Sequence, residues 1–423
     1  MLYSELSEQE LNAILKEEQK KYDKFVKAKL NLDMSRGKPC PKQLDICQDM
    51  LTCLGGKDLS KLYEIDPRNY GGLDGLKAIR EIFADLLDVK TEQVLAGGSS
   101  SLNLMYDIIQ YAMQFGVLGF KPWNKVPNVT FICCVPGYDR HFAICKALGI
   151  KMISVPLRED GPDMDIVESL CKADDSIKGI WCVPKYSNPT GTVYSDEVVR
   201  RLAKMQCAED FRIFWDNAYA VHYLTDKHDE ILNILDECEK AGNPNRAFMF
   251  SSTSKISFAG GGVACVCTSV ENLKDIKSHM TYQTIGANKL VQAMHVEYFK
   301  DADGILDTMK KHAAILKPKF DMVIEKLISY FSESDIINWT TPNGGYFISV
   351  NVLKGCAKEV VKMTAEAGVT LTSAGATFPN GLDDNDSNIR FAPSYPTEEE
   401  LSLACDVFAT AVKIVCIKKL LNK

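Results

Sequence analysis

Lys255 has surroundings that are unusual for a lysine. It follows the hydroxyl-rich run "SSTS" at residues 251–254 and precedes "ISFAGGG" at residues 256–262. Most lysines keep their ammonium group in water. A lysine held among small side chains can instead have its charged form disfavoured, and its amine then becomes a nucleophile that can form a Schiff base with a carbonyl. A surface lysine in a hairpin is the alternative, but small residues on both sides argue against it.

A second group of polar residues lies in "AGGSSSLN" at residues 96–103, directly before a predicted helix. Backbone N–H groups at a helix N-terminus, together with hydroxyl donors, suit a phosphate group. An ordinary serine N-cap is the alternative. The segment has neither the G-x-G-x-x-G pattern nor the P-loop pattern, so it does not support a dinucleotide or nucleoside triphosphate site.

Asp216 follows the apolar run "FRIFW" at residues 211–215. A carboxylate at the end of a buried strand needs a cationic partner or several hydrogen-bond donors, unless it caps a turn. A phosphate anchor, a buried carboxylate and a Schiff-base lysine are the three groups that pyridoxal phosphate requires. The turn sequence "YSNPTG" at residues 186–191 is the fourth candidate, although by itself it indicates only a structural turn.

The elements that must position these residues alternate along the chain. From about residue 75, short apolar runs alternate with helical patterns of about 10–15 residues, which indicates βαβ units and a mostly parallel sheet. Ligands bind at the carboxyl ends of such strands. Five polar segments are expected there, at residues 96–103, 135–141, 183–195, 215–224 and 251–262.

The outer parts of the chain have a different pattern. Residues 5–30 predict one polar helix, and after about residue 290 long helices are followed by strands and a final helix. We therefore expect a large α/β domain at residues 51–300 and a smaller α+β domain at residues 301–423. The N-terminal segment, residues 1–50, is expected to join the small domain.

The composition excludes several classes of protein. A chain of 423 residues, 46% of them hydrophobic, is long enough for more than one domain. A net charge of -7 argues against nucleic acids or anionic membranes as partners. The 15 cysteines show no metal-binding spacing, so no metal site is expected. The sequence has no signal-peptide core and no apolar run of about 20 residues, which favours a cytoplasmic protein.

Four segments occur in an order that is typical of one enzyme family. "NPTG", "DNAY", "SxxSK" and "NIRFAPSYP" together resemble the class I (fold type I) pyridoxal-phosphate aminotransferases over essentially the whole chain. "LDMSRGKP", "NYGGLDG" and "TSKISFAGGGVA" are similar to the aspartate aminotransferase subgroup related to the aminotransferase-like domains of MocR-type regulators. The resemblance implies an α/β/α sandwich around a mostly parallel sheet, plus a smaller α+β domain.

The resemblance also implies roles for the residues that bind the cofactor. Lys255 would form the Schiff base and move the α-proton, while Asp216 would pair with the pyridinium nitrogen. Tyr219 and Asn188 would bind the phenolic oxygen of the ring. Tyr138 would stack on the ring, although a core aromatic residue is the alternative. The phosphate would be held by three serines, Ser99, Ser100 and Ser252.

For the substrate, Arg390 resembles the arginine that grips the α-carboxylate through a bidentate pair, assisted by Asn188 and the backbone N–H of Gly37. Without the family context, Arg390 would be a salt-bridge or strand-edge residue. Tyr70 resembles the tyrosine that reaches the phosphate of the neighbouring subunit, so the resemblance implies a homodimer.

Two positions depart from the family pattern. The family commonly has an arginine eight residues after the lysine, but Val263 stands there, so hydroxyl and backbone groups must meet the phosphate charge. The cation that selects a distal carboxylate is not evident. Arg36, beside Gly37, and Lys289, which could come from the other subunit, are candidates, and each could instead be a solvated cation.

The predicted function is ping-pong transfer of an amino group from aspartate or glutamate to 2-oxoglutarate or oxaloacetate. Other specificities (alanine, aromatic or aminoadipate donors) and a lyase on the same fold are alternatives. The alternative from a different class is a ligand-sensing domain of a transcription regulator. Such regulators carry a basic winged helix, whereas residues 1–30 here have mixed charge. A dehydrogenase would need the missing glycine fingerprint.

Overall fold

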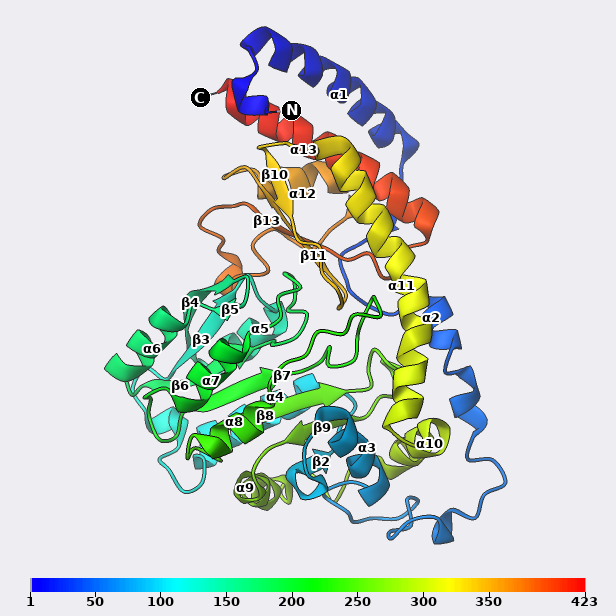
Figure 1. Cartoon of the computed structure of the whole chain (residues 1–423), viewed down its shortest axis with the longest axis vertical. Coiled ribbons are helices and arrows are strands. Elements are labelled where there is room, and N and C mark those ends of the chain that lie inside the picture. Colours follow the sequence, from blue (N-terminus) through cyan, green and yellow to red (C-terminus); the bar gives the residue numbers. More distant parts are fainter. Residues whose placement is uncertain (1, 423) are drawn as a thin grey trace.

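The computed structural model describes residues 2–422 and is built around an eight-stranded sheet in the order β2-β9-β8-β7-β6-β3-β4-β5 (Figure 1). The strands from β8 to β4 in this order run parallel, whereas β9, β2 and β5 pair antiparallel. This confirms the predicted mostly parallel sheet. The strands are β2 (Val94–Ala96), β3 (Thr130–Val135), β4 (Lys151–Arg158), β5 (Gly161–Pro162), β6 (Ile177–Cys182), β7 (Arg212–Asp216), β8 (Ala247–Ser252) and β9 (Ala264–Cys267).

Helices cover both faces of this sheet, because the buried strands carry apolar residues on both sides. In β7, for example, Ile213 and Trp215 belong to one apolar cluster and Phe214 to another. On the first face pack α3 (Lys77–Leu87), α6 (Met164–Ala173), α7 (Asp196–Lys204), α8 (Ile234–Lys240) and α10 (Lys289–Phe299). On the second face pack α4 (Ser101–Phe115), α5 (Asp139–Ala147) and α9 (Val270–Met280).

A second, antiparallel sheet lies above the first in Figure 1, in the order β10-β11-β13. A third apolar cluster joins this sheet to its helices, and α1 and α11 both pack against α13. These elements are α1 (Glu8–Ala28), β10 (Ile337–Trp339), β11 (Ile348–Val352), α12 (Ala357–Glu366), β13 (Asn388–Phe391) and α13 (Glu398–Leu421).

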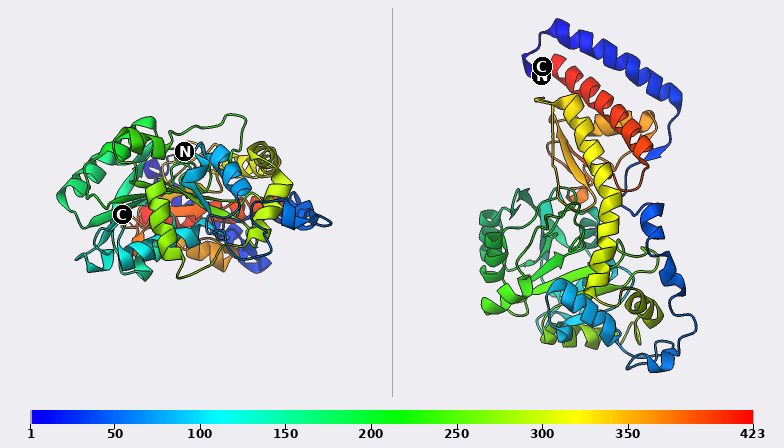
Figure 2. Two further views of the ribbon diagram at one scale, coloured as in Figure 1. Left: turned by 90° about the horizontal axis from the view of Figure 1, so that it is seen from below. Right: turned by 45° about the vertical axis from the view of Figure 1, so that its right-hand side comes forward.

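Two connections tie the sheets together. Helix α11 (Ala302–Phe331) runs from the second sheet down beside the first, where it contacts α10 and α2 (Pro41–Asp45) (Figure 1, Figure 2). Strand β1 (Leu32–Asp33) pairs in parallel with β12 (Val369–Thr370), so the arm that follows α1 is held beside the second sheet. Short 3-10 helices occupy Tyr3–Glu5, Gln48–Thr52, Leu59–Lys61, Thr91–Gln93, Trp123–Lys125 and Pro379–Gly381.

Helix α1 is shorter than the predicted helix at residues 5–30. It begins after Ser7, whose hydroxyl forms a capping box with Glu10, and it ends at Lys29, which has a φ of 51°. No helix between residues 2 and 422 is long and apolar enough to cross a membrane.

Candidate active site

A cavity of about 620 Å³ lies where the carboxyl ends of the central strands meet the second sheet and the arm at residues 35–38. All five polar segments predicted to lie at strand ends contribute to its lining. The predicted site residues that line this cavity are Arg36, Gly37, Ser100, Tyr138, Asn188, Asp216, Tyr219, Ser252, Lys255 and Arg390. Ser99, Tyr70 and Lys289 do not line it.

Lys255 is half-buried and its side chain faces this cavity from the loop between β8 and β9. Its Nζ atom lies 5.1 Å from the ring centroid of Tyr219 and 5.9 Å from that of Tyr346. Burial lowers the pKa of Lys255, and the charge of Asp216 partly opposes this shift. A lysine with a lowered pKa has more of its amine in the nucleophilic form.

Hydrogen bonds to His295 of α10 hold the loop around Lys255 in place. The hydroxyls of Thr253 and Ser257 lie 2.9 and 2.7 Å from Nε2 of His295. The N–H of Val263 donates to Thr253 Oγ1, and the Val263 side chain is buried. Val263 therefore supports the loop and does not line the cavity. A Cβ at Gly262 would lie 3.0 Å from the carbonyl oxygen of Ser99, so the glycine allows this close approach.

Asp216 ends β7 and is 3% exposed. Its Oδ2 atom lies 3.0 Å from Nε2 of His141, and the His141 ring stacks on Trp181 with centroids 4.2 Å apart. An ionised carboxylate only accepts, so the imidazole donates. The Oδ1 atom of Asp216 is buried and has no hydrogen-bond partner among residues 2–422, so it is available to a donor in the cavity. Sequence reasoning missed His141, because its pairing with Asp216 depends on the packing of α5 against β7.

The two predicted tyrosines keep their phenol protons. Burial raises the pKa of Tyr138 to about 12 and that of Tyr219 well above its usual value. Asn188 is 3% exposed, and its Oδ1 atom accepts from Arg390. Tyr138, Tyr219 and Asn188 thus place neutral polar groups in the cavity lining, beside the charged side chains of Lys255 and Arg390.

Arg390 is held in one orientation. Its Nη1 atom donates to Asp139 and Asn188 at 3.0 and 3.2 Å, and its Nη2 atom donates to Thr372 at 3.2 Å. Its guanidinium carbon lies 4.8 Å from the ring centroid of Phe347. Gly37 faces the same ring, and a Cβ there would lie 2.5 Å from Phe347 Cζ. Only glycine lets the arm come this close.

The N-terminus of α4 also faces the cavity. Ser100 is its N-cap but makes no capping hydrogen bond, and its hydroxyl binds Asn103 instead. Ser101 and Ser254 line the cavity as well, and sequence reasoning did not identify them. Ser99 is exposed, and it contributes a backbone carbonyl to the Ser254 hydroxyl at 3.3 Å. Which serine faces the cavity depends on how the loop turns.

Three exposed cations, Arg36, Lys38 and Arg140, line the cavity near solvent. Lys38 lies over the ring of Tyr395, with Nζ 3.8 Å from the centroid. Across the described chain, Arg36 and Arg140 form no ion pair with a carboxylate. Arg140 is a further residue that sequence reasoning missed; it is placed by the first turn of α5.

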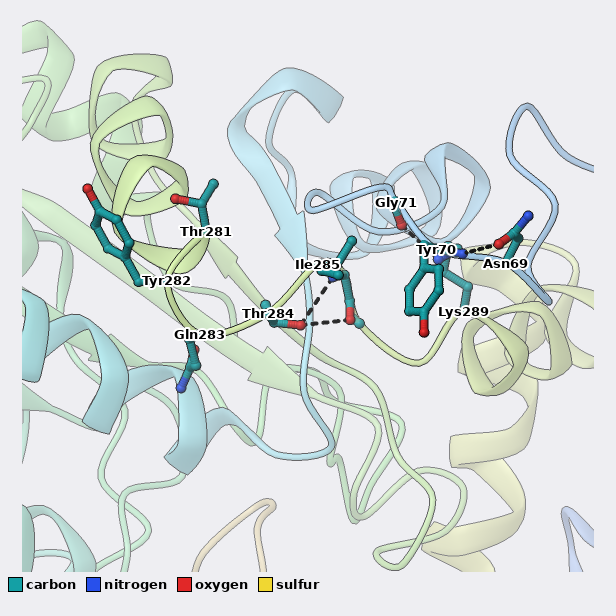
Figure 3. A pocket seen from close by; sticks show the side chains of 11 residues that line it. Asn69, Tyr70, Gly71, Thr281, Tyr282, Gln283, Thr284, Ile285 and Lys289 are labelled. Atoms are coloured by element: carbon teal, nitrogen blue, oxygen red, sulfur yellow. Dashed lines mark hydrogen bonds between the residues drawn. The ribbon is translucent and has the colours of Figure 1, made fainter.

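Tyr70 and Lys289 lie side by side at a different cavity, of about 480 Å³, which also includes residues 281–287 (Figure 3). Tyr70 is 81% exposed. Lys289 is buried, and its Nζ atom donates to the backbone oxygen of Gly71 at 2.7 Å. The Lys289 ammonium is thus bound to the loop that carries Tyr70.

The sequence and the fold of this chain are similar to those of known aminotransferases. A family model described as aspartate amino-transferase matches residues 6–423. An aspartate aminotransferase of Corynebacterium glutamicum is 48% identical over 405 residues, which cover 95% of this chain and 94% of the relative. The crystal structure of an aspartate transaminase from Corynebacterium glutamicum matches with a TM-score of 0.96 at 46% identity, and the match covers 99% of both chains.

A more distant structure shares the fold. The α-aminoadipate aminotransferase of Thermus thermophilus, solved with N-(5'-phosphopyridoxyl)-L-leucine, has a TM-score of 0.75 at 19% identity over 93% of each chain. The predicted fold type I architecture is confirmed by these matches. The match of nearly the whole sequence, in the same order and with the same fold, means that this chain belongs to the aspartate aminotransferase family.

Proposed function

We propose that the protein uses pyridoxal phosphate to move an amino group between aspartate or glutamate and 2-oxoglutarate or oxaloacetate. One observation carries the proposal: Lys255 and Asp216 face the same cavity. The Lys255 amine has no hydrogen-bond partner and Asp216 Oδ1 has none, among the residues that the structure describes.

The residues present fit this cofactor. The orphaned Asp216 Oδ1 atom suits a pyridinium N–H, and the Lys255 amine suits an aldehyde. The N-terminus of α4, with the hydroxyls of Ser100, Ser101, Ser252 and Ser254, suits a phosphate without the arginine that Val263 replaces. When bound, pyridoxal phosphate supplies an aldehyde and a ring that accepts electrons from the substrate Cα.

The surrounding residues then have defined tasks. Lys255 would take a proton from the substrate Cα and deliver it to the aldehyde carbon of the cofactor, which requires an amine that is partly neutral near pH 7. Asp216 would accept from the ring nitrogen through Oδ1, while His141 holds its Oδ2 atom. Tyr219 and Asn188 donate to the ring oxygen, and Tyr138 packs on the ring.

Arg390 is proposed to bind the α-carboxylate, helped by the backbone N–H of Gly37. The distal carboxylate of a dicarboxylic substrate would then be bound by Arg36 or Arg140, since both line the same cavity and neither pairs with a carboxylate in residues 2–422. Lys289 is a weaker candidate, because its ammonium already binds Gly71.

A donor panel tests this proposal. With 2-oxoglutarate as acceptor, aspartate should give a kcat/KM at least about tenfold above alanine and phenylalanine, as expected for one extra charged contact. A preference for phenylalanine or alanine would overturn the dicarboxylate specificity. Absence of keto-acid formation from every donor would overturn the transaminase activity.

We also propose a homodimer in which Tyr70 reaches the cavity of the partner. Tyr70, Tyr282 and Ile285 are exposed around the second cavity, which fits a surface that another copy covers. A heterodimer of Tyr70→Phe and Lys255→Ala protomers tests this geometry. If Tyr70 crosses, both defects fall in one site, so activity should return in the other; no recovery would contradict the crossing.

A further inference from the structure

Three buried polar side chains meet behind the Lys255 loop. Gln43 comes from α2, His312 from α11, and Tyr346 from the turn before β11. Gln43 and His312 are 0% exposed and Tyr346 is 1% exposed. Helix α2, which follows the arm, the long helix α11 and the turn before β11 therefore contribute one residue each to this cluster.

The hydrogen bonds of Gln43 are fully determined. Its Oε1 atom accepts from the backbone N–H of Cys40 at 3.1 Å, so Nε2 faces the other two side chains. Nε2 lies 2.9 Å from Nδ1 of His312 and donates to the Tyr346 hydroxyl oxygen at 3.0 Å. Gln43 thus uses its oxygen and both of its N–H groups.

The tautomer of His312 follows from its partners. Its Nε2 atom lies 3.0 Å from the carbonyl oxygen of Ile256, and because a carbonyl only accepts, Nε2 carries the proton. Nδ1 is then the acceptor that Gln43 requires. Burial lowers the pKa of His312 to about 4, so the ring stays neutral and this arrangement persists at neutral pH.

Two members of the cluster lie next to Lys255: His312 binds the carbonyl of the following residue, and the Tyr346 ring faces the amine. Ile256 is the residue after Lys255, and the Tyr346 ring lies 5.9 Å from the Lys255 Nζ atom. Gln43 also accepts a hydrogen bond from the backbone N–H of Cys40. Cys40 lies just after the arm that carries Arg36 and Gly37 into the cavity lining. The cluster thus connects the lysine to the segment that approaches the substrate.

We propose that Gln43 is a positioning residue that fixes Lys255 relative to the arm, acting through His312 and Tyr346. The inference rests on the proposed function for the role of Lys255. Gln43 touches neither substrate nor cofactor. It sets the place of the Lys255 backbone through the Ile256 carbonyl and excludes water from the amine through the Tyr346 ring.

His295 provides a contrast on the same loop. Its Nδ1 atom lies 2.7 Å from the Val291 carbonyl, so Nε2 accepts from the hydroxyls of Thr253 or Ser257. His295 belongs to α10, and none of these bonds involves the arm. It supports the loop but does not link the loop to the arm.

The test compares Gln43→Met with Asn272→Leu. Met fills the space of Gln43 but leaves Tyr346 and His312 without their donor. Asn272 is a matched control: it is 1% exposed and donates to Asn245 and Thr268, near the amino end of β8 and away from the cavity. The substitution at Asn272 should lower stability without reaching Lys255.

The first readout is the pH midpoint of the visible absorption band of the protein with pyridoxal phosphate bound. The midpoint should rise by about half a unit or more in Gln43→Met, because water then stabilises the charged form of the Lys255 nitrogen. It should not move in Asn272→Leu. Neither substitution removes a charged or titratable group near Lys255; these groups are Asp216, Asp139, Tyr138, Tyr219, His222, His312, Tyr346 and Arg390.

The second readout is hydrogen exchange in the full-length protein. Peptides covering residues 35–43 and 254–258 should both exchange at least about tenfold faster in Gln43→Met than in the unmodified protein. In the control Asn272→Leu, exchange of both peptides should stay unchanged. Tyr346→Phe, which keeps the ring but removes the hydroxyl that accepts from Gln43, should give smaller increases in exchange in the same two peptides. It replaces Gln43→Met in the exchange experiment alone if that variant fails to fold.

The outcomes separate the two proposals. An unmoved midpoint in Gln43→Met, with a normal band in the unmodified protein, would overturn the role of Gln43 and leave the proposed function intact. If the unmodified protein shows no band, the cofactor proposal fails, and hydrogen exchange decides the positioning role. Faster exchange in only one of the two peptides would contradict the link.

Discussion

Two regions of the same cavity differ in how they are held. The cavity floor consists of Lys255, Asp216 and Arg390. His141 binds Asp216, Asp139 binds Arg390, and hydrogen bonds to His295 hold the loop that carries Lys255. The cavity mouth, made of Arg36, Lys38 and Arg140, is exposed and forms no ion pair within residues 2–422.

This difference suggests that the two regions have different tasks, the reaction at the floor and the choice of substrate at the mouth. Groups fixed in a buried site act on a reacting atom without reorganising, and their charges are screened little. Exposed cations on an arm and a helix start are screened by salt and can move to suit a substrate. The floor therefore defines the reaction, and the mouth is expected to define which side chain is accepted.

The largest effect is expected at the floor, from Lys255→Ala. Lys255 is the proposed nucleophile and proton carrier, so without its amine turnover with glutamate should fall by at least about 10⁴-fold. The fold should persist, because the neighbours of Lys255 are anchored without its side chain. Steady-state assays and thermal melting followed by circular dichroism measure both effects. Retained turnover would show that the floor works without a lysine.

Asp216→Asn should lower turnover by about 10²–10³-fold, because a neutral amide no longer favours a protonated ring nitrogen. Cofactor affinity should change less, since we propose that the α4 N-terminus and its serines hold the phosphate. His141→Asn, the control, should cost about tenfold, because it changes one hydrogen bond to Asp216 and leaves the carboxylate itself in place. Titration with pyridoxal phosphate separates binding from turnover. Equal losses in binding and turnover would contradict the role.

Arg390→Ala should lower kcat/KM for aspartate, glutamate and alanine alike. A charge-assisted bidentate contact contributes about 1.5–3 kcal/mol, or roughly one to two decades in kcat/KM. All amino acids carry the α-carboxylate, so the loss should not depend on the side chain. A loss confined to aspartate and glutamate would move Arg390 from the floor group to the selecting group.

The mouth should give the smallest and most selective effects. Arg36→Ala or Arg140→Ala should lower kcat/KM for aspartate by about tenfold and leave alanine nearly unchanged. Lys38→Ala is the matched control from the same arm, because its ammonium already lies over Tyr395. If both arginine variants affect aspartate and alanine equally, the selecting cation lies elsewhere.

The floor could be predicted from the sequence because its residues are tied to local patterns. Asp216 is the last residue of β7 and Lys255 lies in the loop shortly after β8, and the strand ends of a parallel sheet meet at one edge. The predicted helix and strand order also followed from hydrophobic periodicity.

The remaining parts depend on tertiary packing. His141 matters through a contact with Asp216, 75 positions away in the sequence, and Gln43 through contacts with residues more than 260 positions away. Arg140 and Arg36 look like ordinary surface cations until the arm and α5 are placed together. The choice of Ser254 over Ser99 depends on a turn direction that composition does not specify.

The central claim is that Lys255 is the residue that binds pyridoxal phosphate covalently. Reduction of the purified protein with borohydride, followed by peptide mass spectrometry, tests it directly. The visible band should disappear, and each chain should carry one phosphopyridoxyl adduct, on Lys255. An adduct on another lysine, or no adduct in a protein that transaminates, would contradict it.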